Sequence, residues 1–111
     1  MNSVIEDIER IYKPADNGAT FTFPEDFVAF KGHFPQQQLL PAVVQVELAI
    51  FVLSKALKKE VKLKTVKKAK FVSPIFPKET VNLTYADKET FYDISIKKDE
   101  KVISNFQIIV E

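Results

Sequence analysis

The feature that most constrains the fold is a run of mostly apolar residues from Ala42 to Leu57. Pro41 precedes the run, at a place where proline favours the start of a helix, and no turn-forming residue interrupts it. As a helix, this segment would be about 24 Å long. Because the run is apolar on almost every side, we expect the helix to be buried rather than to lie on a surface.

After the helix, the hydrophobic period changes to two, which is typical of strands. The segments concerned are residues 61–71, 80–86, 91–97 and 102–110. The last three are joined by short polar turns, so we expect them to form an antiparallel meander.

Before the helix, residues 2–12 have the apolar spacing of a short amphipathic helix, and residues 14–18 are typical of a turn. Residues 19–23 alternate, which predicts a strand with Phe21 and Phe23 on one face. Residues 27–40 are predicted to be irregular. The whole pattern predicts an α+β fold in which one long central helix is wrapped by a curled antiparallel sheet.

Composition narrows the possible functions. With 111 residues, the chain is expected to form one domain over residues 1–111. A net charge of +1 argues against nucleic acid as a partner. The chain has no cysteine and one histidine, which excludes disulfides, thiolate nucleophiles and cysteine-ligated zinc, and we expect no metal and no cofactor.

The N-terminus is acidic and mixed, unlike a secretory signal. The longest apolar stretch, residues 39–53, is interrupted by Pro41, Gln45 and Glu47, and is shorter than the ~20 residues that a membrane span needs. We therefore expect a soluble, cytoplasmic protein without a membrane span.

Two titratable residues are candidates for catalysis. His33 is the only histidine and follows Gly32 in the irregular segment, where functional residues are common. Glu47 is the only acid between Asp26 and Glu60, and it lies within the apolar helix, where an unpaired carboxylate is costly. A neutral imidazole that accepts a proton and a carboxylic acid that donates one would form a general base and general acid pair.

The residues alone also allow plainer interpretations. A single histidine in a loop is often incidental. Glu47 shares a helical stripe with Phe51, Ser54 and Lys58, which could be a narrow solvated face.

Eight lysines lie between positions 55 and 70. Four of them alternate along the predicted strand, as they would on a solvated strand face. They could also form a landing site for an acidic partner. The four are Lys62, Lys64, Lys68 and Lys70.

Two motifs resemble the 3-hydroxyacyl-acyl-carrier-protein dehydratases. Residues 30–35 (F-K-G-H-F-P) and 39–47 (L-L-P-A-V-V-Q-V-E) resemble that family's F-x-G-H-F-P-x-x-P-x-x-P-G-V-x-x-x-E, with the histidine and the glutamate at the family's spacing. Residues 68–77 (K-A-K-F-V-S-P-I-F-P) resemble its K-x-K-F-x-x-P-V-x-P. The resemblance covers about residues 19–110, and short members from fatty-acid or aryl-polyene synthesis are the most similar.

The resemblance implies a hot-dog fold and a homodimer, or a larger assembly, with the active site at the dimer interface. His33 of one protomer would face Glu47 of the other. His33 would remove the C2 proton of the thioester, and Glu47 would protonate the departing C3 hydroxyl. The backbone N–H of Ala42 would polarise the thioester carbonyl, with Phe34 and Pro41 beside the substrate.

The same resemblance implies an acyl carrier protein as the partner. Carrier proteins are acidic, so a basic surface that includes Lys62 and Lys64 would attract them. The reaction would turn a 3-hydroxyacyl group into a trans-2-enoyl group.

The chain departs from the family pattern at three places. Ala42 replaces a glycine, Gln38 replaces a proline, and Lys78-Glu79 stands where Gly-Asp is common. The Ala42 N–H can serve the carbonyl only if the backbone there has negative φ. Two alternatives stay open, a hot-dog acyl thioesterase and a non-catalytic subunit that binds acyl carriers.

Overall fold

The computed structural model describes residues 2–30 and 39–111, which form two helices, a short 3-10 helix and six strands. In chain order the elements are α1 (Asn2–Ile11), β1 (Tyr12–Ala15), β2 (Gly18–Thr22), η1 (Val28–Phe30), α2 (Ala42–Leu57), β3 (Leu63–Phe71), β4 (Thr80–Asp87), β5 (Tyr92–Lys98) and β6 (Lys101–Val110).

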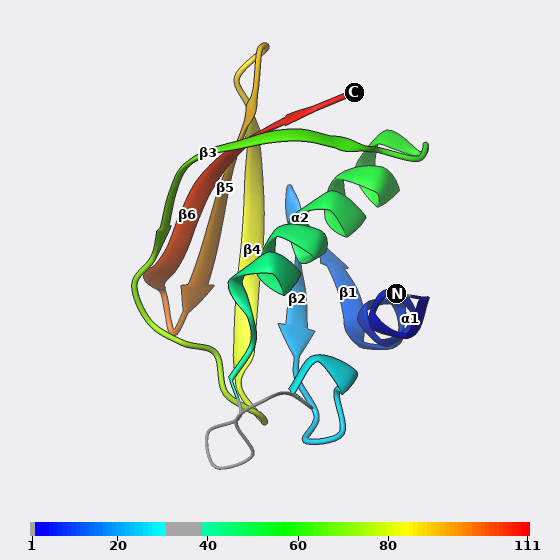
Figure 1. The fold of residues 1–111 in the computed structure, drawn as a ribbon. Helices are drawn as coiled ribbons and strands as arrows, with labels where there is room; N and C mark the ends of the chain where they lie inside the picture. Colours follow the sequence, from blue (N-terminus) through cyan, green and yellow to red (C-terminus); the bar gives the residue numbers. More distant parts are fainter. Residues whose placement is uncertain (1, 31–38) are drawn as a thin grey trace.

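The six strands form one antiparallel sheet in the order β1-β2-β4-β5-β6-β3. The predicted meander is confirmed as β4-β5-β6. Figure 1 shows α2 lying across the concave side of the sheet, with β3 bending over its end and α1 beside β1. The expected α+β arrangement of a long helix wrapped by a curved sheet is therefore confirmed.

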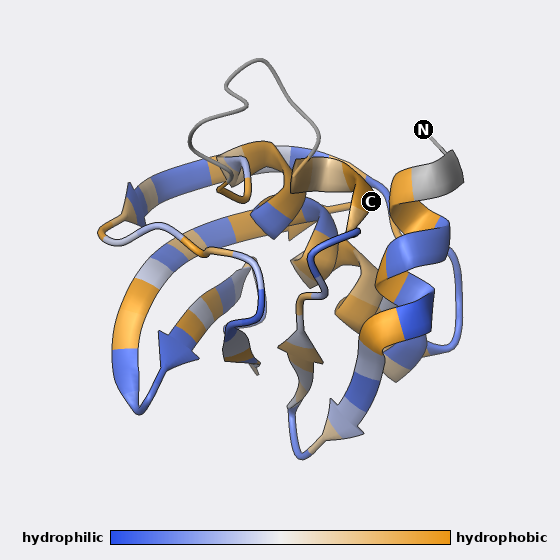
Figure 2. Ribbon diagram, turned by 90° about the horizontal axis from the view of Figure 1, so that it is seen from below, coloured by the Kyte–Doolittle hydropathy of each residue, from blue (hydrophilic) through white to orange (hydrophobic). Residues whose placement is uncertain are grey.

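The core lies between α2 and the inner face of the sheet. Aromatic and β-branched side chains alternate along the strands, so one face of each strand is apolar. Phe21 and Phe23 are both fully buried on the same side, as their spacing predicts. Figure 2 shows α2 as a largely hydrophobic ribbon against strands that carry alternating hydrophobic and hydrophilic bands.

The bounds of α2 agree with the prediction at both ends. Pro41 is the N-cap, with the extended backbone that a residue before a helix adopts (φ −62°, ψ 148°). Lys58 ends the helix in the left-handed conformation (φ 56°), and the next residue's N–H donates to the Ser54 carbonyl at 3.3 Å.

The prediction for residues 14–18 was wrong in part. Residues 12–15 form β1, which pairs with β2 through partners such as Tyr12 with Phe21, and only Asp16 and Asn17 make the turn. Pro14 lies opposite Ala19 on this edge strand. Proline is tolerated there because one side of an edge strand has no neighbour to which an N–H must donate.

The predicted alternation of lysines along β3 is also wrong. The register of β3 against β6 shifts between Leu63 and Thr65 and again between Lys67 and Lys70, and Lys68 has a positive φ of 52°. Such bulges insert a residue and reverse the faces that follow. Partners across the ladder share a face, so Lys67 and Lys70 lie with Gln107 and Asn105 on the outer face.

Candidate active site

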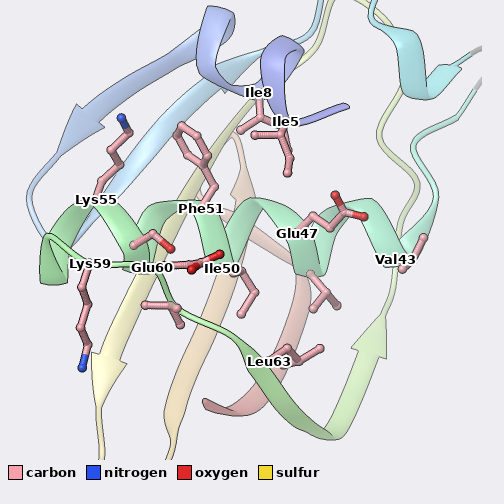
Figure 3. Close-up of a pocket in the computed structure, with 13 residues that line it drawn as sticks. Ile5, Ile8, Val43, Glu47, Ile50, Phe51, Lys55, Lys59, Glu60 and Leu63 are labelled. Atoms are coloured by element: carbon pink, nitrogen blue, oxygen red, sulfur yellow. The ribbon is translucent and has the colours of Figure 1, made fainter. Parts of the chain in front are cut away.

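An apolar groove of about 750 Å³ runs along the side of α2 that does not pack on the sheet. Figure 3 shows the groove between α2, the start of α1 and the segment that enters β3. Most of its lining is apolar, with charged side chains at positions 47, 55, 59 and 60. The lining residues are Ile5, Ile8, Val43, Val46, Glu47, Ile50, Phe51, Ser54, Lys55, Lys59, Glu60, Val61 and Leu63.

Glu47 projects from the first half of α2 into this groove. Figure 3 shows its carboxylate on the side of the helix that faces Ile5, with Val43 one turn before it. The side chain is half-buried, and it makes no hydrogen bond or ion pair with another described residue. The expectation that Glu47 lies in a wholly buried helix was wrong, since one side of α2 borders an open groove.

The groove face of α2 is neither a core face nor a solvated one. Val43 is 65% exposed, while Ile50, Phe51 and Ser54 are half-buried beside Glu47. The stripe itself is largely polar, with Phe51 as its one apolar member, but Val43 and Ile50 beside it are apolar. The groove face as a whole is therefore more apolar than an ordinary solvated face, as a surface that another molecule covers would be.

The start of α2 offers backbone donors near Glu47. The N–H groups of Val44 and Gln45 both donate to the Pro41 carbonyl, at 3.0 and 3.3 Å. Within the described residues, the N–H of Ala42 and that of Val43 have no acceptor, as is usual in a first helical turn. Ala42 is helical and is absent from the residues with positive φ, so the condition for its N–H to serve a carbonyl is met.

The other predicted site residues are distributed as follows. His33 and Phe34 lie outside the described residues. Pro41 is exposed at the start of α2. Lys62 and Lys64 are exposed on either side of Leu63, whose side chain lines the groove, so both lysines are adjacent to its rim.

The contribution of α1 was not predicted. Ile5 and Ile8 line the groove, and Glu9 pairs with Lys55 at 3.1 Å across to α2. Lys55 also lies over the ring of Phe51, 5.2 Å from its centroid. The amphipathic spacing of residues 2–12 predicted an apolar side on this helix, but it does not show which other element that side would face.

Within residues 2–30 and 39–111, no three side chains of the metal-ligating types gather as an ion site would require. No helix there is long and apolar enough to cross a membrane.

Several solved structures are similar in fold to this chain, among them the three that follow. A chain of the dehydratase heterocomplex ApeI:P from Xenorhabdus doucetiae has a TM-score of 0.72 and 24% identity, over 87% of this chain and 89% of that one. An uncharacterized protein from Erwinia carotovora subsp. atroseptica gives 0.65 and 22%, over 90% and 89%. The dehydratase domain of MlnD from Bacillus amyloliquefaciens gives 0.61 and 16%, over 90% of this chain and 41% of that one.

These likenesses show the fold, which is the hot-dog fold of the dehydratases. No curated protein matches the sequence. The family model described as ApeI-like, ApeI dehydratase, matches residues 12–107, which is most of the chain. A match of this extent supports a dehydratase role, and therefore a lyase. The chain belongs to the ApeI-like dehydratase family.

Proposed function

We propose that the protein dehydrates 3-hydroxyacyl groups on an acyl carrier protein to trans-2-enoyl groups. The observation that carries the proposal is the position of Glu47 in an apolar groove, where its carboxyl group has no partner among the described residues. Glu47 lies on the helix whose first N–H groups have no acceptor in the same part of the chain. An acyl chain fits an apolar groove, and a proton donor belongs at its reacting end.

The proposed reaction needs three groups of this chain. His33 accepts the C2 proton of the thioester, and the C3–O bond breaks as Glu47 donates a proton to the departing hydroxyl, which leaves as water. The Ala42 N–H donates to the thioester carbonyl, where negative charge develops as the C2 proton leaves. The positive end of the α2 dipole adds to this stabilisation.

The test is turnover of a 3-hydroxyacyl carrier protein, followed by mass spectrometry. The unchanged protein is expected to give a product lighter by about 18 Da, while His33→Ala and Glu47→Gln each lower kcat by about 10²-fold or more. Release of free acid would instead indicate a thioesterase. Binding without turnover would indicate a carrier-binding subunit, a role that the ApeI:P heterocomplex makes worth testing.

The proposal includes a homodimer in which His33 of one protomer serves Glu47 of the other. The exposed Val43 and Leu63, with the half-buried Ile50 between them in sequence, form the apolar wall that a second copy would cover. Mixing the inactive His33→Ala and Glu47→Gln proteins then restores about a quarter of the activity. Half of the dimers are mixed, and each mixed dimer has one intact site. Both residues in one protomer would give no restoration.

Carrier docking is proposed at Lys62 and Lys64, beside the groove rim. The double change Lys62→Glu and Lys64→Glu is expected to raise KM for the carrier-bound substrate about tenfold and to leave KM for a small thioester analogue unchanged. Lys97→Glu with Lys101→Glu is the matched control. These two exposed lysines carry the same charge near the other end of β6, where residue 101 pairs with residue 98. Equal effects of the two double variants, or on the two substrates, would contradict the docking site.

A further inference from the structure

Two polar side chains are buried in the core of the described chain, and they bind each other. Gln45 on α2 is 2% exposed and Ser104 on β6 is fully buried. The Ser104 hydroxyl donates to Gln45 Oε1 at 2.5 Å. This hydrogen bond directly joins the long helix to the sheet beneath it.

The two partners stand where apolar residues are expected. Ser104 lies opposite Ile96 on β5 and opposite Phe71 on β3, on the inner face of the sheet. Gln45 shares the sheet-facing side of α2 with buried residues such as Leu48 and Val52. An apolar pair at these positions would avoid the cost of burying polar groups, so the core packing alone does not require this pair.

Gln45 is also close to Glu47 in sequence and opposite to it in space. Residues two apart on a helix are separated by about 200° around its axis. Gln45 therefore faces the sheet where Glu47 faces the groove. Any rotation of α2 about its axis moves the two side chains together.

Apolar contacts between a helix and a sheet are non-directional, so they fix the helix rotation only loosely. A hydrogen bond is directional and fixes it closely. A side-chain tip lies about 5–6 Å from the helix axis, so a rotation of ~20° would move the Glu47 carboxyl group by about 2 Å. Displacements of this size at a reacting group are costly to catalysis.

We propose that Gln45 and Ser104 are positioning residues that set the rotation of α2 and so aim Glu47 into the groove. This inference rests on the proposed function for its kinetic consequence. The structural part, a helix rotation fixed by one buried hydrogen bond, stands apart from any reaction.

The first test is a double-mutant cycle with apolar replacements of similar shape. Ser104→Ala alone leaves the Gln45 amide without its partner and is expected to lower Tm. Adding Gln45→Met removes the stranded polar group and is expected to restore most of Tm. In the double variant, kcat nevertheless stays about tenfold or more below that of the unchanged protein, while KM changes less than about twofold.

A merely structural pair would behave differently. The double variant would then recover kcat together with Tm, which would overturn the proposal. Leu53→Met, a volume-conserving change at a fully buried position late in α2, is the control and is expected to leave kcat unchanged.

The second test needs no turnover. The chain has no cysteine, so Glu47→Cys creates a unique position for a nitroxide label. With Gln45 and Ser104 present, the spin-label spectrum is expected to show one motional component. With Gln45→Met and Ser104→Ala added, a second component is expected as α2 samples other rotations.

Identical label spectra in the two backgrounds would overturn the inference. A second component in the altered background, together with no dehydration by the unchanged protein, would refute the proposed function and leave the helix-positioning role supported. The two ideas therefore fail by different measurements.

Discussion

Removing the Glu79 carboxylate is expected to loosen the segment that holds the start of α2. Glu79 Oε1 accepts the Phe76 N–H at 2.8 Å, and both Glu79 oxygens accept from Lys98 Nζ at 3.0 Å. Lys98 also donates to the Pro74 carbonyl at 3.2 Å. Together these bonds close the loop between β3 and β4.

A backbone hydrogen bond joins that loop to the segment that precedes α2. Ile75 is fully buried in the loop, and its carbonyl accepts the Leu40 N–H at 2.9 Å. Leu40 precedes Pro41, the N-cap of α2. The Glu79 network therefore supports the segment that positions the Ala42 N–H.

The size of the effect follows from burial. Hydrogen bonds to charged groups contribute about 1.5–3 kcal/mol each, and the Glu79 carboxylate has two such partners. The side chains of Lys98 and Glu79 are 23% and 30% exposed, so solvent weakens the ion pair in part. We expect Glu79→Ala to lower the free energy of unfolding by about 2–3 kcal/mol, which is roughly 10 °C in Tm for a domain of this size.

Glu25→Ala is the matched control. Glu25 Oε1 lies 2.9 Å from Lys78 Nζ, slightly closer than the Glu79–Lys98 pair, but these side chains are 66% and 75% exposed. Exposed pairs contribute about 0–1 kcal/mol, so Tm should change by at most ~4 °C. Urea unfolding gives both free energies, and hydrogen exchange at the Leu40 amide reports the local loosening. Equal losses in the two variants, or an unchanged Leu40 exchange rate in Glu79→Ala, would refute the reasoning.

Two further predictions concern the sheet. Burial, and then the charge of Asp87, raise the pKa of Tyr92. The folded state therefore keeps the phenol proton to a higher pH than the unfolded state does, and stability is lost as pH rises above about 10. The urea midpoint of Tyr92→Phe should fall less between about pH 9 and pH 11 than that of the unchanged protein, and an equal fall would contradict the assignment. Gly18→Ala is expected to disrupt the pairing of β2 with β4, because the new Cβ would overlap the Leu83 carbonyl oxygen and lie 3.0 Å from Thr84 Cα. Since backbone atoms cannot move aside cheaply, Tm should fall by more than ~10 °C, and an unchanged Tm would show that β4 can shift.

The parts of the fold that local patterns determine could be predicted. The bounds of α2 follow from a proline before the run and sixteen helix-compatible residues, and the β4-β5-β6 meander follows from period-two segments joined by short turns. Strand β1 could not be predicted, because the sequence around Pro14 is also that of a turn. Only the pairing of β1 as an edge strand makes the proline acceptable.

The bulges in β3 could not be predicted from the sequence for a similar reason. Lys68 adopts a positive φ that lysine does not favour, so no residue type marks the shift. At Lys78, by contrast, the departure from the family pattern is informative. The φ of Lys78 is 73°, a conformation that glycine adopts at low cost, so the glycine of the family pattern would suit the backbone of this chain at that position.

The candidate site was predicted in its residue types but not in its surroundings. Hydropathy shows that α2 is apolar on nearly every side, and the simplest inference is a helix buried in its own domain. In the structure, the sheet covers only the side that carries Gln45, Leu48 and Val52, while Val43 remains 65% exposed. A helix that faced water on that side would gain nothing from an exposed valine beside Glu47. The apolar excess of α2 is therefore more than one chain needs for its core, and under the proposed dimer it is the surface that a second copy and the acyl chain would share.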